Sequence, residues 1–299
     1  METQADLRAR TLAETPLEQV GVVGGFFSGT LPSIAAVWQR RELLSFLVRR
    51  ELKSRYKDSS LGFLWSLARP LTQLLIYYVV IGTFLGSARS IDNFAIYVFS
   101  GLTAFTLFSE IVGLGTASIV ANSGLVKKIY LPREVFPLAT VGSSLFNFAI
   151  QLVILTVASA LLGSLTLGAN LFYFVGALII ILLYATALAF FLSATNVYLR
   201  DIQYLVEVVL TLLMWASPIV YSWPQVAAHL PPWLAELYLA NPVTIAVLGF
   251  HEAFWKSGAA TTPAGLPMRM VICGVIGVIL LWASQRVFSS LEGNFAQEL

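Results

Sequence analysis

Long stretches without charged side chains recur along the chain between Leu64 and Arg286. A bilayer core about 30 Å thick needs roughly 20 consecutive apolar residues for one helical span. The stretches therefore predict an all-α integral membrane protein, with six membrane-spanning helices in a domain over residues 61–299. The predicted spans cover residues 64–86, 94–117, 136–163, 170–196, 203–222 and 269–289.

The segment before the first span divides into two parts. Residues 1–32 are predicted to be a mobile extension, and residues 33–60 an amphipathic helix. Its apolar positions recur every four residues while its cations fall on another side, as shown by Leu44, Val48, Leu52, Arg50 and Lys53. Such a helix suits the membrane surface, with its apolar stripe in the headgroup boundary. Docking onto a soluble partner is the alternative, and one helix can do both.

The cationic residues are distributed unevenly between the two sides of the predicted membrane domain. Fourteen of the 18 lysines and arginines fall on the same side of the membrane as the N-terminus, whereas only Arg89, Lys256 and Arg269 fall on the opposite side. By the positive-inside rule, both termini are expected in the cytoplasm. Charged residues make up 11% of the chain, against about 25% in a soluble domain, so no large soluble domain is expected.

Polar residues at the predicted cytoplasmic ends of the spans suggest interface roles. Trp65 has the character of an interface anchor, and Pro70 lies in the first turns, where a missing N–H costs little. Arg69 can either snorkel to the surface or form a specific ion pair. Arg200 and Asp201 form a tight turn after the fourth span and are expected to cap helix ends.

The loop between the second and third spans contains a predicted short amphipathic helix over residues 119–131, which a proline ends. Leu125 and Val126 give it apolar positions, and Lys127 and Lys128 follow them. The helix can lie along the membrane as a simple connector or dock on another protein. Composition alone does not separate these two interpretations.

The connection between the fifth and sixth spans, residues 223–268, contains six prolines. Its part from Val243 to Trp255 is nevertheless too apolar for an exposed loop. Irregular backbone is tolerated inside a membrane only where protein buries it or water reaches it. We therefore expect external helices that re-enter the outer leaflet, separated by proline breaks.

Several kinds of chemistry are absent from the sequence. It has no glycine-rich phosphate loop for ATP, and His229 and His251 lack neighbouring metal ligands, so no catalytic residue, metal site or cofactor is expected. Glu110 and Glu207 are the carboxylates within predicted spans. Intramembrane carboxylates suggest function, but for Glu110 we favour a polar contact to another helix, with Arg69 as a candidate partner, over a proton-carrier role.

Five short stretches follow one another along the spans: Leu61-Gly62-x-x-Trp65 with Arg69-Pro70, Lys127-Lys128-x-x-x-Pro132-Arg133-Glu134, Asn196-x-Tyr198-x-Arg200-Asp201, Ser217-Pro218-x-x-Tyr221 and Asn241-Pro242. Together they resemble the signature stretches of type-2 ABC exporter permeases, in particular the polysaccharide, O-antigen and teichoic-acid exporters. The resemblance covers about residues 35–295. Each stretch is weak alone, but five in this order are specific.

The resemblance implies a half-transporter in the bacterial cytoplasmic membrane. Two copies would form the pore, driven by two copies of a separate ATPase subunit that binds ATP and Mg²⁺. The implied cargo is a polysaccharide of O-antigen, galactan or teichoic-acid type on a polyprenyl diphosphate lipid, and nucleic acid is not a partner. The helices over residues 223–268 would form an outer gate.

The resemblance also implies positions for coupling to the ATPase. The surface helix with Arg50 and Lys53 would contact it, and the loop over residues 119–134 would act as a coupling helix. The implied contact residues of the loop are Leu125, Val126, Lys127, Lys128, Arg133 and Glu134. Further residues are assigned to the cytoplasmic interface: Trp65, Arg69, Pro70, Arg200 and Asp201.

Aromatic side chains in the spans could give sugar rings flat stacking surfaces. The candidates for lining a pore are Tyr77, Tyr78, Phe84, Phe105, Phe108 and Trp215. For each of them, contact with lipid or a neighbouring helix is the alternative.

Other functions agree less well with the residues. A permease of the same fold that exports a drug or a small lipid is the near alternative. A membrane glycosyltransferase or polymerase would need a catalytic cluster in a large loop, and residues 223–268 offer only the carboxylates Glu236 and Glu252. A channel without an energy source would not need the basic surfaces.

Overall fold

The computed structural model describes residues 30–56, 64–89, 91–128, 131–166, 168–255 and 262–299. Every regular element in these ranges is helical, as predicted. The predicted mobile extension over residues 1–32 falls almost entirely outside them.

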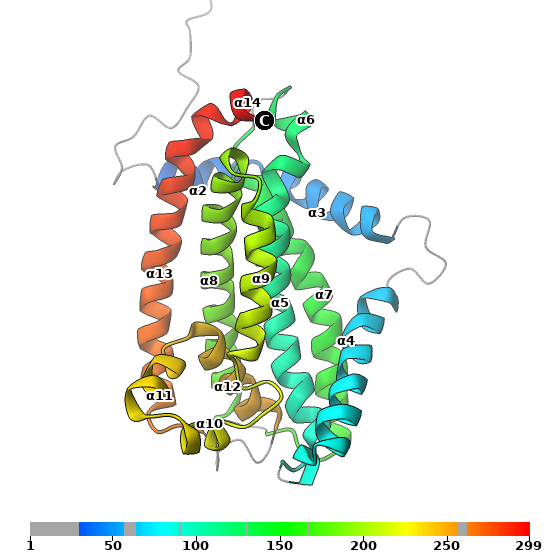
Figure 1. Cartoon of the computed structure of the whole chain (residues 1–299). Helices are drawn as coiled ribbons and strands as arrows, with labels where there is room; N and C mark the ends of the chain where they lie inside the picture. Colours follow the sequence, from blue (N-terminus) through cyan, green and yellow to red (C-terminus); the bar gives the residue numbers. More distant parts are fainter. Residues whose placement is uncertain (1–29, 57–63, 90, 129–130, 167, 256–261) are drawn as a thin grey trace, which may run out of the picture.

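Four long apolar helices run side by side and form the centre of the molecule (Figure 1). They are α5 (Phe94–Ala121), α7 (Val135–Leu161), α8 (Leu171–Tyr198) and α13 (Leu266–Leu291). Each agrees within a few residues with one of the predicted spans. Helix α5 is the most deeply enclosed, because it packs against α7, α8 and α12 along its length.

Neither of the other two predicted spans is a single long α-helix. The span over residues 64–86 consists of α4 (Leu64–Tyr77) followed by the π-helical η1 (Tyr78–Phe84). Helix α9 (Ile202–Trp215) ends well before residue 222. Within the described residues, the length and composition of the helices therefore give four candidate spans, or five with the bent pair α11–α12.

The early end of α9 has a local cause. Pro218 disfavours a helical conformation in the residue before it, Ser217. The hydroxyl of Ser217 instead donates to the carbonyl of Leu213 at 2.8 Å. The hydroxyl of Tyr97 lies 2.8 Å from the carbonyl of Pro218 and 2.7 Å from that of Tyr221. These contacts hold residues 216–222 as an irregular turn instead of a continuation of α9.

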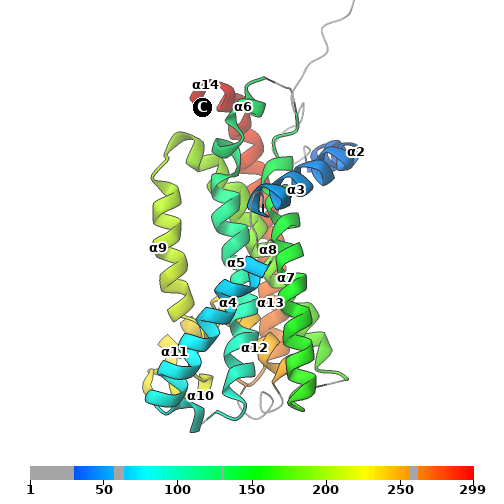
Figure 2. The ribbon, with the colours of Figure 1, turned by 90° about the vertical axis from the view of Figure 1, so that its right-hand side faces the viewer.

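The connection after α9 folds into short helices with proline breaks, as predicted. They are α10 (Trp223–His229), α11 (Pro232–Leu239) and α12 (Pro242–Phe254), each with proline in its first turn, where no N–H is needed. Helices α11 and α12 meet at 77°. Helix α12 is buried against α5 and α8, whereas α10 and α11 lie at the end of the bundle (Figure 2).

The N-terminal helices α2 (Thr30–Gln39) and α3 (Arg41–Tyr56) lie across the opposite end (Figure 2). The apolar stripe of α3 packs on α7 of the same chain: Leu47 is buried, and a methyl of Val48 lies 2.7 Å from where a Cβ on Gly142 would be. The same chain therefore covers part of the stripe, because α7 offers a glycine at the contact, while Leu44, Val48 and Leu52 are half-buried. The place of this helix at the headgroup boundary stays a prediction.

The loop after α5 also differs from its prediction. Helix α5 continues to Ala121, because Ile119 is fully buried and extends its apolar face. The carboxamide of Asn122 donates to the carbonyl of Ser118 at 2.8 Å and ends the helix. Only the single turn α6 (Ser123–Val126) follows, in place of a separate helix over residues 119–131.

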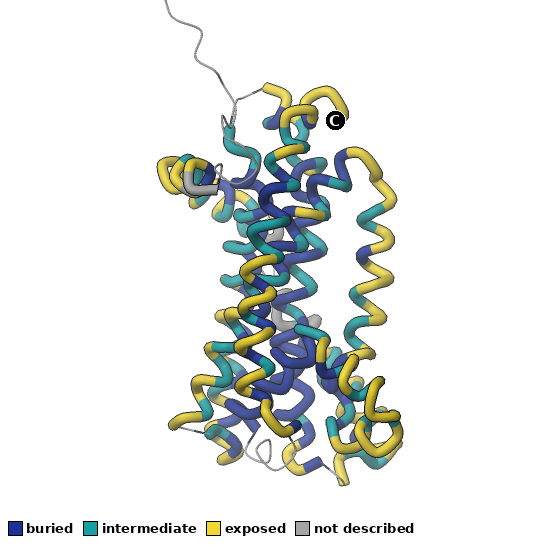
Figure 3. Tube along the Cα trace, turned by 90° about the vertical axis from the view of Figure 1, so that its left-hand side faces the viewer, coloured by how far each residue is buried: buried dark blue, intermediate teal, exposed yellow. Residues whose placement is uncertain are grey.

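The remaining short elements lie at the two ends of the bundle. They are η2 (Ser87–Arg89), η4 (Glu292–Asn294) and α14 (Phe295–Glu298). Buried residues run the length of the molecule between these ends, with exposed residues on the outer helices (Figure 3).

Close packing of α5 on α8 predicts a position-specific effect of an added methyl group. A Cβ at Gly115 would lie 2.5 Å from the Cβ of Ala189, whereas a Cβ at Gly113 meets nothing within 4 Å. Overpacking a tight contact costs about 1–3 kcal/mol. We expect Gly115→Ala to lower the melting temperature of the purified protein in detergent and Gly113→Ala to leave it unchanged or raise it. Equal melting temperatures would contradict this packing.

Candidate functional site

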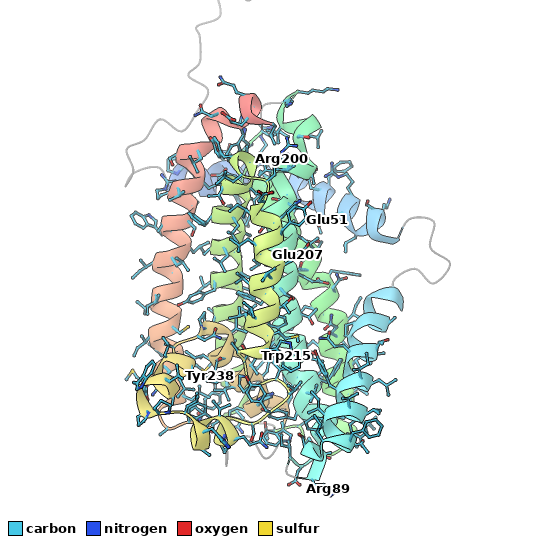
Figure 4. The ribbon with its side chains drawn as sticks, in the orientation of Figure 1. Glu51, Arg89, Arg200, Glu207, Trp215 and Tyr238 are labelled. Carbon is cyan, nitrogen blue, oxygen red and sulfur yellow. The ribbon has the colours of Figure 1, made fainter. Side chains whose placement is uncertain are left out.

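The cationic residues collect at one end of the bundle, which we call the basic end. It is formed by α2, α3, α6, α14 and the α8–α9 turn with Arg200 (Figures 1 and 4). Lys127 and Lys128 follow α6 directly, and Arg49, Arg50 and Lys53 are exposed on α3. The opposite end holds Arg89 and Arg269. The described cations are therefore divided between the two ends as the sequence predicts.

A second hydrophobic core, separate from the main one, holds the basic end together. We call it the basic-end core. It takes side chains from α3, α5, α6, α7, α8, α13 and α14: Leu47, Ile119, Val126, Val135, Phe136, Ala139, Phe190, Ala194, Val197, Phe288 and Phe295. Elements that are far apart in the sequence are thus packed into one unit.

The predicted coupling residues of α6 divide into inward and outward groups. Val126 is only 6% exposed and belongs to the basic-end core, and Leu125 packs on that core while partly exposed. Lys127 and Lys128 are exposed. Val126 therefore cannot anchor a partner protein as predicted, because it anchors α6 to its own chain.

Arg133 and Glu134, at the start of α7, also contact their own chain. The guanidinium of Arg133 lies over the ring of Phe295, 5.7 Å from its centroid. Glu134 is 4% exposed and accepts a hydrogen bond from Nε2 of Gln285 at 3.3 Å. The prediction that Glu134 faces the ATPase is therefore wrong for this structure, since the carboxylate is turned toward α13.

The end of α13 continues this polar contact. The buried guanidinium of Arg286 donates to Oε1 of Gln285 at 2.8 Å and 2.6 Å. Glu292 lies beyond α13, outside the predicted span. Burial raises the pKa of its carboxyl to about 7; the charge of Glu134 adds to the shift, and Arg133 and Arg286 oppose it.

Arg50 and Lys53 on α3 differ in their surroundings. The guanidinium of Arg50 donates to the side-chain carbonyl of Asn122, just after α5. Arg50 thereby fixes α3 to the point where α5 gives way to α6. Both side chains are exposed, but the guanidinium of Arg50 is engaged by Asn122 of the same chain.

The other predicted interface residues differ in how far they are exposed. Arg200 and Asp201 form an exposed turn, and Asp201 precedes α9 without a side-chain cap hydrogen bond, so the predicted capping is not seen. Pro70 is buried within α4. The side chains of Trp65 and Arg69 lie outside the described part of the structure.

Glu110 makes the kind of contact that the sequence suggests. Its Oε2 accepts a hydrogen bond from Nδ2 of Asn147 at 3.2 Å, which links α5 to α7 within the bundle. Hydrogen bonds of this type between membrane helices contribute about 0.6 kcal/mol on average. Glu110 therefore has an evident structural role in pairing these two helices.

The candidate pore aromatics are not equivalent. Phe105 and Phe108 are 7% and 3% exposed and pack in the main core around α5, so they offer no surface to a cargo. Tyr78, Phe84 and Trp215 are exposed. Tyr77 is partly buried and meets Trp215 edge-on at 6.3 Å between ring centroids. Helices α4 and α9 thus present the aromatic residues that remain candidates.

At the end opposite the basic end, an aromatic cluster supports the short helices. Tyr238 stacks on Trp223 with ring centroids 5.9 Å apart (Figure 4). Glu236 on α11 pairs with Arg269 on α13 at 2.8 Å. Among the described residues, no three His, Cys, Asp or Glu side chains lie close enough to hold a metal ion.

The sequence analysis did not predict the role of the C-terminal segment, residues 285–299, in the basic-end core. The rings of Phe288 and Phe295 meet edge-on with their centroids 5.5 Å apart, and the hydroxyl of Tyr198 donates to the carbonyl of Leu291 at 3.1 Å. The only sequence signal was two phenylalanines seven residues apart at the end of the last apolar stretch. Their burial depends on partners from α6, α7 and α8, which are distant in the sequence.

The raised pKa of Glu292 predicts that attachment of the C-terminal segment depends on pH. The stabilisation that the protonated carboxyl of Glu292 gives to the folded segment is fully present below the ordinary pKa of 4.5, and it is lost as pH rises through about 7. A spin label at Gln297→Cys, in a Cys273→Ser background, should become more mobile over this range. Glu292→Gln should remove the pH dependence, and a persistent dependence in that variant would contradict the assignment.

Comparison with known proteins identifies the family. The sequence profile of the ABC-2 type transporter family matches residues 42–255. The chain is 30% identical to the O-antigen export system permease protein RfbA of Myxococcus xanthus over 89% of this chain and 98% of that protein. It is 25% identical to a protein of that name from Klebsiella pneumoniae over 86% and 95%, and 20% identical to the capsule polysaccharide export inner-membrane protein CtrC of Neisseria meningitidis over 81% and 89%. The chain belongs to the ABC-2 type transporter family of membrane proteins.

Proposed function

We propose that this chain is the permease subunit of an ATP-driven exporter that moves a lipid-linked polysaccharide of O-antigen type across the bacterial cytoplasmic membrane. The observation that carries the proposal is the similarity to the Myxococcus O-antigen permease along nearly the whole length of both chains. The Klebsiella relative has the same name, and further relatives are named for polysialic acid transport and capsule polysaccharide export. These names favour a polysaccharide over a drug or small lipid. The chain is a transport subunit and not an enzyme.

We propose six spans, with α4–η1 and α9 completing the four long helices. Helix α9 has one buried residue, Val206, and exposes Glu207 among leucines and valines (Figure 4). A carboxylate facing hydrocarbon costs free energy, about 2.5–3.5 kcal/mol at the centre of a span and less toward its end, where Glu207 lies in the second turn of α9. This side of α9 therefore fits a water-filled path between two copies of the chain better than a lipid-facing surface. The proposed assembly is a homodimer.

We assign the basic end to the cytoplasm, with both termini there. The excess of lysine and arginine at this end supports the orientation. The same charges favour the anionic headgroups of the inner leaflet, including the diphosphate of a polyprenyl carrier. The aromatic cluster with α10 and α11 would then lie at the outer surface and act as a gate.

The proposed energy source is a separate ATPase subunit, two copies per complex, that binds ATP and Mg²⁺. The chain itself lacks a phosphate loop. Its exposed cations Lys127 and Lys128, beside the single-turn helix α6, fit acidic residues of such a subunit. Arg133 and Lys53 lie on neighbouring elements at the same end.

The geometry supports a mechanical route from the ATPase to the spans. Closure of the ATPase on ATP would displace α6. Because Val126 is packed in the basic-end core, α3, α5 and α7 would move with α6 as one body. Tyr78, Phe84 and Trp215 on α4 and α9 would give the sugar rings exposed aromatic faces along the path.

Charge reversal beside α6 tests the docking surface. Lys127→Glu with Lys128→Glu replaces favourable contacts with repulsion, which should reduce export at least about tenfold while the protein still inserts and dimerises. The measurement is polysaccharide export, with abundance in the membrane as a reference. Arg89→Glu, a reversal at the opposite end, should export normally. Normal export by the double variant would make α6 a simple connector.

Labelling from each side of the membrane tests the orientation. In a Cys273→Ser background, Lys128→Cys should react with a membrane-impermeant maleimide only from the cytoplasmic side, and Arg89→Cys only from the outside. Both side chains are exposed, so each can react without unfolding. Labelling in the reverse sense would overturn the proposed topology.

A further inference from the structure

The C-terminal segment folds back over the basic end (Figure 1). Phe295 on α14 is fully buried, although α14 is one helical turn. Its ring meets Phe288 of α13 at 5.5 Å, Tyr198 of α8 at 6.3 Å and the guanidinium of Arg133 at 5.7 Å. Phe295 therefore joins the end of α13, the end of α8 and the residues just before α7, which are distant from one another in the sequence.

The loop that carries α6 has little structure of its own. Helix α6 has four residues, far below the roughly 12–15 at which an isolated helix becomes marginally stable. Its position must come from packing, and Val126 packs in the same core as Phe295. Helix α14 also contacts α6 directly.

Buried polar contacts fix the other end of the same loop. Glu134, which follows Arg133, accepts from Gln285 of α13, and Gln285 in turn accepts from Arg286. All three side chains are buried, so breaking these hydrogen bonds would leave polar groups without water to replace the lost partner. The loop between α5 and α7 is thus held from α13 and α14 at both ends.

We infer that the C-terminal segment, residues 285–299, is a positioning element for coupling, which holds the α6 loop against the bundle and links its movement to α13. The inference rests on the proposed function for its meaning, but the contacts do not depend on it. Movement of α6 would then reach α13 through Phe295 and Gln285, in addition to α5 and α7, which are continuous with the loop. Phe295 acts through the loop and does not touch the cargo.

The position of the loop can be measured on the chain without any partner. A spin label at Gly124→Cys, in a Cys273→Ser background, reports on α6, since a Cβ at Gly124 meets nothing within 4 Å. Phe295→Ala should make this label mobile, whereas Gln297→Ala, an exposed residue of the same helix, should not. An unchanged spectrum in Phe295→Ala would overturn the inference.

Coupling is then measured in the complete complex with its ATPase subunit in proteoliposomes. Phe295→Ala should leave the KM for ATP and complex assembly unchanged but reduce the polysaccharide exported per ATP at least about fivefold, a typical size for coupling between sites. If Phe295→Ala exports as much polysaccharide per ATP as wild type, the segment has no role in coupling.

The two experiments separate this inference from the proposed function. If the wild-type complex exports no polysaccharide, the proposed function fails, and the label at position 124 still decides whether the segment positions the loop. If wild type exports and Phe295→Ala fails to assemble, Phe295→Leu fills the core without a ring for Arg133. Loss of coupling in Phe295→Leu supports the inference, and normal coupling overturns it.

Discussion

Hydrocarbon offers no hydrogen-bond partner to a peptide group, so a chain inside a membrane must satisfy its own backbone. This constraint explains why every described element is helical, and polar side chains satisfy backbone carbonyls at several of the breaks between helices. Tyr97 covers the turn after α9 by approaching two carbonyls. Thr166 donates to the carbonyls of Glu252 and Ala253 where α12 ends. Where α5 ends, the carboxamide of Asn122 donates to the carbonyl of Ser118.

Two cores divide the molecule, and α5 belongs to both. Its residues from Phe94 to Val112 pack in the main core, while Ile119 packs in the basic-end core with Val126 and Phe295. Small residues let the helices approach closely, as at Gly115 against Ala189. A displacement at α6 therefore has a direct rigid route into the centre of the bundle, through the most deeply buried of the four long helices.

The sequence predicted four spans closely because their apolar stretches exceed the membrane thickness. It overestimated the span ending at residue 222, because the residues after Trp215 are apolar although Pro218 prevents a helix there. It assigned the stripe of α3 to lipid headgroups, and Gly142 on α7 lets part of that stripe, at Val48, pack on protein. An apolar stripe reveals that a face is buried but not what buries it.

The family and the division of charge between two ends were determined by the sequence alone, since both depend on residue identity and order. The tertiary structure decided which residues of the basic end face outward. Val126 and Glu134 turn inward and Lys127 and Lys128 outward, because Phe295, Gln285 and the end of α5 occupy particular places around them. Those neighbours come from distant parts of the chain, and no local pattern encodes contacts formed only when seven helices meet.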